Sequence, residues 1–578
     1  MLRTHRCGEL RKKHVGKKVK LCGWIHAMRV MGKKIFIDLR DRYGIVQLVL
    51  DERFKSVVEK LRRESVILVS GKVVERKEPN PKLETGEVEV VVESLAVLSR
   101  AEPLPLEIFN PEIKTTEETR LRYRYLDLRR PEMQKILEFR FKAEMIVRNY
   151  LAMHDFIEIE TPYLSKPTPE GARDFLVPSR TFRGKFWALP QSPQLYKQLL
   201  MVAGFDRYFQ IARCFRDEDL RKDRQYEFTQ IDIEMSFADE EDVMKISEGL
   251  IATLYAQLLG IELKRPFPRI KWKEAMDRYG SDKPDLRFGL ELKDFTEFFG
   301  KSGFKIFDNI VSEGGVVKGI VVKELLSKKV LREADKIAKA HEFPGIAWIK
   351  REERYYGPIA SALPRSILEE ILEENSTAFL LAGEWLKVCE ALGDIRNLVG
   401  EGLGLRKGLS VVWVTDFPLF EWSEEKRRIQ AAHHPFTMPQ KGYEEKLFEK
   451  LTEKELLEIP ARAYDLVING VEIGGGSVRI TDTRLQERVF EILGISRDEA
   501  WKKFGMLLEA FRYGVPPHAG IAFGLDRLLQ VMLGKETIRD VIAFPKSKSG
   551  KALMEDAPSE ADEELLKELG IKIEVPRE

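Results

Sequence analysis

The segment Tyr208–Phe237 constrains the fold more than any other part of the sequence. Two β-rich runs lie on either side of a highly charged loop, which predicts a strand, a loop and a second strand. Because side chains alternate between the two faces of a strand, one face of the second strand is expected to be polar throughout. That face carries Gln230, Asp232, Glu234 and Ser236. At the end of the first strand, Arg216 and Glu218 also share one face.

Arginine and carboxylates along one wall of a sheet suit a triphosphate and an amino acid as ligands. The alternative is a half-exposed hairpin whose polar face contacts water, which is the commoner origin of such alternation. A row of Gln, Asp, Glu and Ser is unusual for a water-exposed face, and it favours a binding site.

A glycine-rich segment, Tyr464–Ile480, predicts a second part of this site. Its three consecutive glycines, 474–476, would let a ligand approach the backbone, although alone such a run is more often a loop or a bulge. Asp465 and Glu472 lie in adjoining extended stretches and could share a cation through oxygen ligands, as Mg²⁺ prefers. Arg479 could bind a carboxylate through two hydrogen bonds.

A third segment, Gly520–Leu533, is expected to change from strand to helix at Gly524. This places Arg527 in the first helical turn, where a cation opposes the helix dipole unless an anion compensates it. The position favours phosphate binding over the alternative of an ordinary surface arginine.

Common nucleotide and zinc motifs are missing. The segment Gly300–Ser302 resembles the end of a P-loop, but Phe295 stands where that motif requires glycine, and no GxGxxG follows a strand. His433 and His434 are adjacent and would point in opposite directions on an extended chain, which disfavours zinc.

At 578 residues the chain is too long for one hydrophobic core, so several domains are expected. Short β-rich runs separated by turn residues in 19–104 predict the five strands of a small barrel. Apolar residues at helical spacing predict one long helix from Pro131. A buried strand from Val411 is expected to continue the earlier sheet, which makes 285–408 an insertion.

Charge is distributed unevenly, although the net charge is only +2. Residues 1–50 hold thirteen Lys or Arg against three acids, which indicates a polyanionic partner. Residues 555–578 hold nine acids against three bases and predict a solvated helix. The sequence has no apolar run of ~20 residues and no paired cysteine motif, which predicts a cytoplasmic protein with no membrane segment. A charged fraction of 33% leans toward a heat-adapted protein.

Together these segments resemble the three signature motifs of class II aminoacyl-tRNA synthetases. The long helix with Glu158–Pro162 resembles motif 1, the segment 215–228 resembles motif 2, and Gly520–Arg527 resembles motif 3. Three further strings are similar to those of aspartyl-tRNA synthetases: 168–174, 191–197 and 474–479. The large insertion and the Cys-Gly-Trp-Ile-His string in the barrel resemble the bacterial type.

The resemblance implies an α+β fold with an N-terminal five-stranded oligonucleotide-binding (OB) barrel, a catalytic domain with an antiparallel sheet and helices, and an inserted α+β domain. Residues 1–104 are expected to form the OB anticodon-binding domain, and residues 105–130 a hinge. Residues 131–284 would form the first part of the catalytic domain, which contains motifs 1 and 2, and residues 409–550 its second part, which contains motif 3. Residues 285–408 would form the inserted domain between them, and residues 551–578 a C-terminal extension.

The function implied is the activation of L-aspartate by ATP to aspartyl-adenylate, followed by transfer to tRNA(Asp). Whether tRNA(Asn) is charged as well stays open at this point. Mg²⁺ is the implied cofactor, and a homodimer formed through motif 1 around Pro162 is the implied assembly.

The resemblance also implies site residues. The catalytic residues would be Arg216, Glu472 and Arg527. The aspartate-binding residues would be Glu170, Ser192, Gln194, Lys197, Arg216, Asp232, His433 and Arg479. The ATP-binding residues would be Arg216, Asp217, Glu218, Gln225, Phe228, Glu472, Gly524, Leu525, Asp526 and Arg527. Mg²⁺ would be held by Asp465 and Glu472, and the anticodon by Arg29, Phe36 and Gln47.

Within this scheme Arg216 would bridge the substrate α-carboxylate and the α-phosphate, and adenine would lie between Phe228 and Arg527. Lys197 and Arg479 would bind the side-chain carboxylate of aspartate. For Phe36 the alternative is a core position, because isoleucines flank it on both sides.

The sequence disfavours three other functions. An asparagine- or lysine-specific relative would leave the two cations Lys197 and Arg479 uncompensated by a carboxylate. A tRNA-independent amidating ligase with the same catalytic core would lack the basic barrel. A non-enzymatic nucleic-acid-binding protein would not need Arg216, Glu472 and Arg527.

Overall fold

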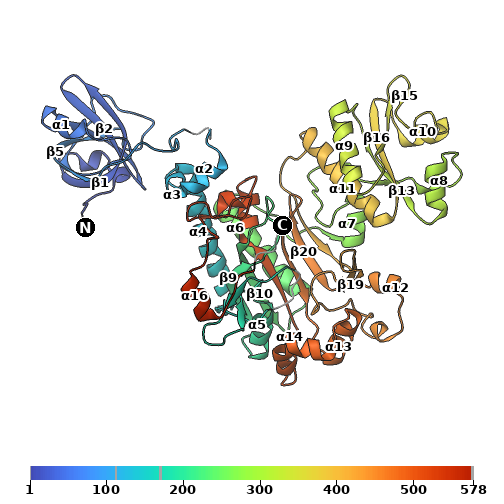
Figure 1. Ribbon diagram of the computed structural model, residues 1–578. Coiled ribbons are helices and arrows are strands. Elements are labelled where there is room, and N and C mark those ends of the chain that lie inside the picture. Colours follow the sequence, from blue (N-terminus) through green and yellow to red (C-terminus); the bar gives the residue numbers. More distant parts are fainter. Residues whose placement is uncertain (1, 111–113, 168–171, 575–578) are drawn as a thin grey trace. The chain divides into compact units, whose positions relative to one another are not determined.

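The structure is a computed structural model that describes residues 2–110, 114–167 and 172–574. The chain divides into two compact units, Met1–Asp127 and Leu128–Glu578, and each is described by itself (Figure 1).

The first unit contains a closed five-stranded barrel, with its strands in the order β1-β2-β3-β5-β4. They are β1 (Lys18–Met31), β2 (Lys34–Asp41), β3 (Gly44–Leu50), β4 (Val66–Glu75) and β5 (Val88–Ser99). Alternate aliphatic residues point inward and are fully buried, among them Leu21, Ile37, Leu48, Ile67 and Val90. The prediction of a five-stranded barrel is confirmed.

The chain that follows the barrel packs within the same unit. Leu106, Ile108 and Leu126 form a small buried cluster next to α2 (Glu117–Arg122) and α3 (Arg124–Asp127). The ring of Phe109 lies under the guanidinium groups of Arg40 and Arg63, 5.1 and 4.3 Å from the ring centroid. Residues 104–110 are therefore fixed to the surface of the barrel.

The second unit is built on an eight-stranded sheet, within the part of the chain that the structure describes, in the order β11-β17-β20-β21-β22-β10-β9-β6. Its strands are β6 (Ile157–Glu158), β9 (Arg207–Phe215), β10 (Glu227–Ser236), β11 (Arg269–Lys271), β17 (Val411–Thr415), β20 (Ala463–Ile468), β21 (Val471–Val478) and β22 (His518–Gly524). Antiparallel pairing holds for the central strands, while the edge strands β6 and β11 pair in parallel. The sheet is therefore mixed, not purely antiparallel.

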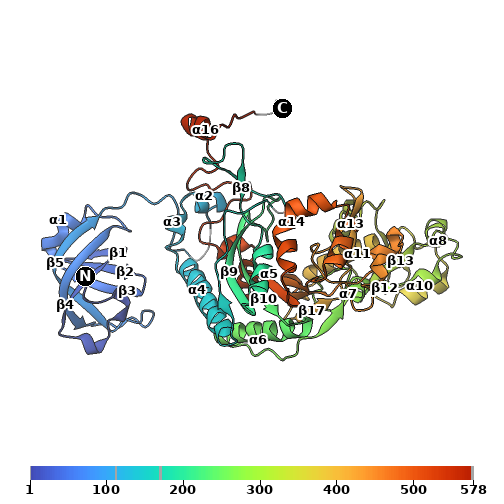
Figure 2. The ribbon, with the colours of Figure 1, turned by 90° about the horizontal axis from the view of Figure 1, so that it is seen from below.

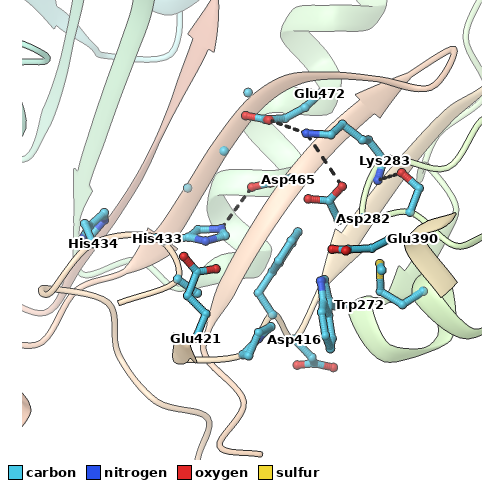
Figure 3. Close-up of a pocket in the computed structure, with 18 of the residues that line it drawn as sticks. Trp272, Asp282, Lys283, Glu390, Asp416, Glu421, His433, His434, Asp465 and Glu472 are labelled. Atoms are coloured by element: carbon cyan, nitrogen blue, oxygen red, sulfur yellow. Dashed lines mark hydrogen bonds and ion pairs between the residues drawn. The ribbon is translucent and has the colours of Figure 1, made fainter. Parts of the chain in front are cut away.

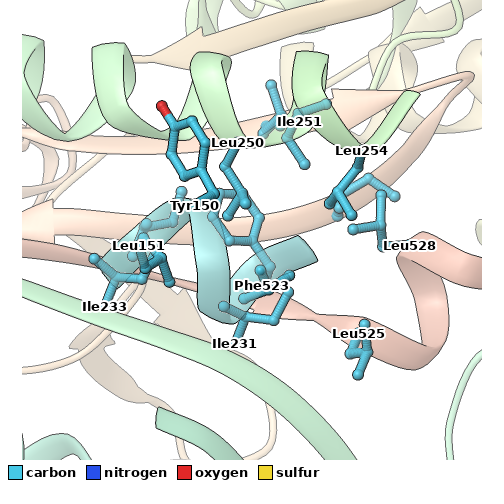
Figure 4. Close-up of a cluster of buried hydrophobic side chains, with 14 of the residues drawn as sticks. Tyr150, Leu151, Ile231, Ile233, Leu250, Ile251, Leu254, Phe523, Leu525 and Leu528 are labelled. Carbon is cyan, nitrogen blue, oxygen red and sulfur yellow. The ribbon is translucent and has the colours of Figure 1, made fainter. Parts of the chain in front are cut away.

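Two long helices cover one face of this sheet, α4 (Pro131–Ala152) and α6 (Glu240–Leu259). Tyr150 and Leu151 of α4 pack with Ile231 and Ile233 of β10 and with Phe523 of β22, as Figure 4 shows. Proline at the first position of α4 suits a helix start, because its missing N–H would have no intrahelical partner. The predicted long helix is confirmed, and its core leaves the polar face of β10 on the opposite side of the sheet.

Other helices border the sheet. They are α5 (Gln194–Val202), α7 (Trp272–Tyr279), α12 (Glu453–Leu457), α13 (Thr483–Ile492), α14 (Arg497–Phe511) and α15 (Leu525–Met532). Two small hairpins, β7–β8 (Leu176–Pro178, Phe186–Ala188) and β18–β19 (Phe420–Ser423, Arg428–Ala431), complete this part. The acidic end forms α16 (Glu563–Leu569), which buries no residue, as expected for a solvated helix (Figure 2).

Residues 293–383 form a separate five-stranded sheet in the order β12-β13-β16-β14-β15. Its strands are β12 (Lys293–Asp294), β13 (Val316–Val322), β14 (Ala347–Arg351), β15 (Tyr355–Tyr356) and β16 (Ser376–Gly383), accompanied by α8 (Lys305–Ser312), α9 (Lys328–Ala340), α10 (Arg365–Ile371) and α11 (Trp385–Gly402). Helix α11 packs closely on α7, where a Cβ on Gly393 would lie 2.0 Å from the carbonyl oxygen of Gly280. Among the described residues, no helix is long and apolar enough to cross a membrane.

Candidate active site

The polar face of β10 lines a cavity of about 2360 Å³ in the second unit. Strands β20, β21 and β22, helix α5 and the start of α15 supply the walls near β10, and α7, α11 and β18 line part of the remainder. Figure 3 shows the acidic side of the cavity. Asp232 and Glu234 are fully buried there, and Gln230 and Ser236 are each 9% exposed. The alternative of a water-exposed hairpin is therefore wrong, because both faces of β10 are covered.

Two cations and two carboxylates meet in the wall of this cavity, where Lys197, Asp232 and Arg479 line it and Glu234 lies fully buried behind them. The Lys197 Nζ lies 2.8 Å from Asp232 Oδ1 and 3.3 Å from Glu234 Oε2. Arg479 donates from Nε and Nη2 to the two oxygens of Glu234, over 2.9 and 3.1 Å. The sheet register pairs Glu234 with Gly520. A Cβ on residue 520 would lie 1.9 Å from the Glu234 carboxylate, so the glycine leaves room for this side chain.

The charges in this group compensate one another. Burial by itself would raise the pKa of Glu234, but Arg479 and Lys197 lower it to about 2, so Glu234 is ionised. Burial, together with the neighbouring Arg479, lowers the pKa of His434 well below its usual range, so His434 is neutral. Its Nε2 therefore accepts a hydrogen bond from Arg479 Nη1, which also donates to Ser477 Oγ over 2.7 Å.

Several polar atoms in the cavity remain open to a ligand. Among the described residues, Asp232 Oδ2 and Gln194 Nε2 are buried and have no hydrogen-bond partner. A lysine has three N–H donors and an arginine five. Within the described part of the chain, the contacts of Lys197 with Asp232 and Glu234, and those of Arg479 with Glu234, His434 and Ser477, leave one N–H of each cation for a ligand that accepts hydrogen bonds.

At the other end of the cavity, the segment 215–228 places an arginine over an aromatic ring. The Arg216 guanidinium lies 5.0 Å from the centroid of the Phe228 ring. Arg527 donates from Nη1 to the backbone carbonyl of Glu472 over 2.9 Å, and its Nη2 lies 3.4 Å from Asp223. Arg527 is in the first turn of α15, as predicted.

Other predicted nucleotide residues are already engaged with the protein. Glu218 is 3.1 Å from Arg224, and the Gln225 side-chain oxygen accepts from the backbone N–H of Lys546 over 2.7 Å. The Asp217 backbone N–H donates to the carbonyl of Arg173. Leu525 is fully buried in the core behind Gly524.

Asp465 and Glu472 lie on neighbouring strands, β20 and β21, at the edge of the cavity (Figure 3). Asp465 Oδ1 is 3.4 Å from His433 Nε2 and has no hydrogen-bond partner among the described residues. Burial raises the pKa of Asp465, the neighbouring His433 opposes this rise, and the nearby Glu472 and Asp282 carboxylates add to it. A buried carboxylate oxygen that makes no hydrogen bond among the described residues, 3.4 Å from a histidine and beside further carboxylates, fits a hard divalent cation.

Among the described residues, no group of three or more His, Cys, Asp or Glu side chains could hold a metal ion without further ligands. A magnesium ion bound by one or two carboxylates and by substrate phosphates needs no such cluster. A Cβ at Gly475 would lie 2.5 Å from Asp465 Oδ1, so glycine there keeps the carboxylate accessible.

Comparisons with known proteins agree with this geometry. Residues 116–548 match the family described as tRNA synthetases class II (D, K and N), and residues 19–98 match the OB-fold nucleic acid binding domain. The chain belongs to the class II tRNA synthetases.

Relatives of this synthetase match it over nearly the full length. The aspartate–tRNA(Asp/Asn) ligase of Thermotoga neapolitana is 51% identical, covering 99% of this chain and 100% of the relative. That of Aquifex aeolicus is 50% identical, with 99% and 98% covered. The aspartate–tRNA ligase of Clostridium acetobutylicum is 46% identical, with 100% and 98% covered. A crystal structure of asparaginyl-tRNA synthetase from Pyrococcus horikoshii, 22% identical, shares the fold with a TM-score of 0.60 over 95% of this chain and 99% of that one.

Two predicted aspartate-binding residues of the synthetase, Glu170 and Ser192, belong to the segment 170–192. Glu170 lies outside the described residues, between Pro167 and Ala172. Ser192 lines the cavity, and beside it the Gln191 side chain donates to Asp174 Oδ1 over 2.7 Å, which attaches the chain after residue 171 to the site.

The sequence prediction did not assign a role to Glu234. Alternation placed this residue on the polar face of β10, but its two cationic partners come from residues 37 positions earlier and 245 positions later. The polar row on β10 could have pointed to Glu234, because a carboxylate on a strand that is covered on both faces needs a cationic or hydrogen-bonding partner.

In the segment that resembles the end of a P-loop, around Gly300–Ser302, the backbone N–H groups bind a carboxylate of the same chain. Backbone N–H groups of Gly300, Ser302 and Gly303 donate to the Asp308 carboxylate over 2.8–3.0 Å. These donors are therefore used by an internal carboxylate, in agreement with the sequence argument against a P-loop.

Two of the three predicted anticodon residues, Arg29 and Phe36, lie on the outer face of the barrel, and the third, Gln47, is buried, with 6% of its surface exposed. Arg29 pairs with Phe36 across β1 and β2, and Phe36 is half-buried on the outer face, while Ile35 and Ile37 fill the core. The alternative of Phe36 as a core residue is therefore wrong. Gln47 lies on the adjoining strand β3, where its side chain donates to Glu89 and accepts from Arg76.

Proposed function

We propose that this class II synthetase is an aspartate–tRNA ligase that activates L-aspartate with ATP, forming aspartyl-adenylate and releasing pyrophosphate, and then transfers aspartate to tRNA, releasing AMP. The observation that carries the proposal is the pair of free N–H donors on Lys197 and Arg479. A side-chain carboxylate presents acceptors to both donors, whereas an amide would turn its NH₂ group toward one of them. The names of the full-length relatives agree with this choice.

The remaining polar atoms fit the rest of the amino acid. The open oxygen of Asp232 can accept from the α-ammonium, next to the side chains of Gln194 and Ser192. His433 and Glu170 would close the site above them. Arg216 would then meet the α-carboxylate and the α-phosphate together, and it would stabilise the negative charge that develops as the carboxylate attacks phosphorus. The substrate carboxylate is itself the nucleophile, so positioning and electrostatics carry the reaction.

The nucleotide would occupy the other end of the cavity. Phe228 and Arg527 would form the two walls around adenine, with Glu218 at its edge and with Asp217, Gln225 and the Gly524–Asp526 segment nearby. Mg²⁺, held by Asp465 and Glu472, would screen the phosphate charge against the incoming carboxylate. The same two-carboxylate arrangement leaves the remaining coordination positions to phosphate oxygens and water.

The assembly we propose is a homodimer through motif 1. Phe141 and Met145 on the outer face of α4 are 62% and 40% exposed, and Ile157, after the helix, is 49% exposed. A second copy covering these side chains and the Pro162 region would bury this apolar surface. Charging of tRNA would place the enzyme with translation, in the cytoplasm.

We further propose that both tRNA(Asp) and tRNA(Asn) are charged, following the relatives of 51% and 50% identity that are named for both. The purified protein should then attach aspartate to either purified tRNA, measured with radiolabelled aspartate. A protein that charges tRNA(Asp) and leaves tRNA(Asn) uncharged would show that only the narrower function holds. A protein without aspartate-dependent ATP–pyrophosphate exchange would refute the ligase function itself.

The barrel should act in tRNA recognition and not in activation. Phe36→Ala should weaken tRNA binding by about ten- to a hundredfold, because one base–aromatic stack is worth ~1–3 kcal/mol. Pyrophosphate exchange and the melting temperature should stay unchanged, since Phe36 lies outside the barrel core. The matched control is Ile37→Ala, which should destabilise the barrel by ~2–5 kcal/mol because Ile37 is fully buried. Equal loss of melting temperature in both variants would contradict the anticodon role.

A further inference from the structure

Arg140 of helix α4 connects the three motifs from the side of the sheet that faces the helices. Its Nη1 donates to Asp526 Oδ1, and its Nη2 donates to Thr229 Oγ1 over 3.0 Å. Nη1 also lies 3.3 Å from the carbonyl oxygen of Val541. The Arg140 and Asp526 side chains are 15% and 3% exposed, so the pair is largely shielded from water.

Asp526 completes the connection through its second oxygen. Oδ2 accepts from the backbone N–H of Thr229 over 2.8 Å. The ladder between β10 and β22 ends at the pair Gln230 and Gly524, where β22 turns into α15. The Asp526 carboxylate therefore holds β10 to the first turn of α15 at the point where backbone pairing stops.

The positions of the two residues bound by Arg140 are informative. Thr229 directly follows Phe228, and Asp526 directly precedes Arg527. Phe228 and Arg527 are the two walls of the proposed ATP site. Gly524, the residue that precedes α15, has no side chain to cap the helix, so the contacts of Asp526 add to the burial of Leu525 in holding its first turn.

We propose that Arg140 is a positioning residue for ATP, which sets the separation of the Phe228 and Arg527 side chains through Thr229 and Asp526. This inference rests on the proposed function, since the two walls are assigned to ATP there. A guanidinium suits the task because its planar group donates in two fixed directions, to two acceptors on different elements. The Asp526 carboxylate would then act on ATP by holding Arg527 in place, instead of by the direct ATP contact that the family resemblance implies.

A purely structural role for Arg140 predicts a different outcome. The synthetase offers a matched pair for comparison in Arg462, which binds Glu240 and joins the start of β20 to α6. The Arg462 side chain is 11% exposed, similar to that of Arg140, and no proposed substrate residue adjoins it. Loss of either ion pair should cost stability, but only loss of the Arg140 pair should change ATP use.

The experiment measures ATP–pyrophosphate exchange while ATP and aspartate are varied separately. Arg140→Gln should raise the KM for ATP by about ten- to a hundredfold, as a displaced catalytic group does, and leave the KM for aspartate within about twofold. Arg462→Gln should leave both KM values unchanged at a similar loss of melting temperature. The double variant Arg140→Gln/Asp526→Asn should be no worse than the poorer single variant, because both changes break one connection.

An ATP KM for Arg140→Gln within twofold of the parent, a parallel rise in both KM values, or additive effects in the double variant would overturn the inference. If Arg140→Gln does not fold, Arg140→Lys gives the same decision, because a single ammonium cannot bridge both acceptors in the same geometry. A raised ATP KM in Arg140→Lys supports the inference, and an unchanged one overturns it. Failure of the proposed function is distinguishable, since the parent protein would then show no aspartate-dependent exchange.

Discussion

Arg479→Leu should lower kcat/KM for aspartate in pyrophosphate exchange by about a thousandfold. The change removes a donor to the substrate carboxylate, and among the described residues it leaves Glu234 with Lys197 as its one remaining ion-pair partner. Truncating one member of a buried, hydrogen-bonded charge pair costs ~2–5 kcal/mol or more, and ~4 kcal/mol corresponds to a thousandfold. The measurement is the exchange rate at subsaturating aspartate.

Binding of ATP provides the internal control for Arg479→Leu. Arg479 contacts Glu234, His434 and Ser477, and it makes no contact with Arg216, Phe228 or Arg527 within the described residues. The variant should therefore keep the increase in melting temperature that Mg²⁺ and ATP give the parent. Near-normal exchange at low aspartate would rule out Arg479 as the residue that selects aspartate.

Glu472→Gln should raise the Mg²⁺ concentration needed for half-maximal exchange by about ten- to a hundredfold and lower the maximal rate. An amide keeps the size of the side chain but removes the charge that holds a hard cation. Mutating a residue that only orients a metal ligand lowers metal affinity by about ten- to a hundredfold, and removing a ligand should lower it at least as much. A Mg²⁺ titration at saturating ATP and aspartate measures it, with melting temperature against Mg²⁺ as a second readout.

Lys283 supplies a matched control at the same carboxylate. Its Nζ lies 3.8 Å from Glu472 Oε2 and would compete with a cation for that oxygen. Lys283→Gln should therefore leave the Mg²⁺ requirement unchanged or lower it, although it alters the same neighbourhood by one charge. If the Mg²⁺ titrations of Glu472→Gln and the parent coincide, Glu472 is not a ligand.

Some of the architecture could be predicted from the sequence because it depends on local patterns. Short β-rich runs separated by turn residues predicted the five barrel strands, and helical spacing predicted α4 from Pro131. The row from Gln230 to Ser236 and the helix start at Gly524 were also local features, so the polar wall and the place of Arg527 were predicted correctly. Residue roles came from resemblance to a family, since composition and spacing alone do not assign them.

The tertiary structure decided which charges compensate one another. Glu234, Lys197 and Arg479 come from three distant elements, and only sheet pairing and the packing of α5 bring them within 3.3 Å. Phe36 needed the register of the barrel to be placed on the outer face, because isoleucines flank it on either side. The same holds for Arg140, which lies 386 residues before Asp526. A sequence pattern determines which face a side chain occupies, but contacts between distant segments depend on how the strands pair, and only the folded chain specifies that.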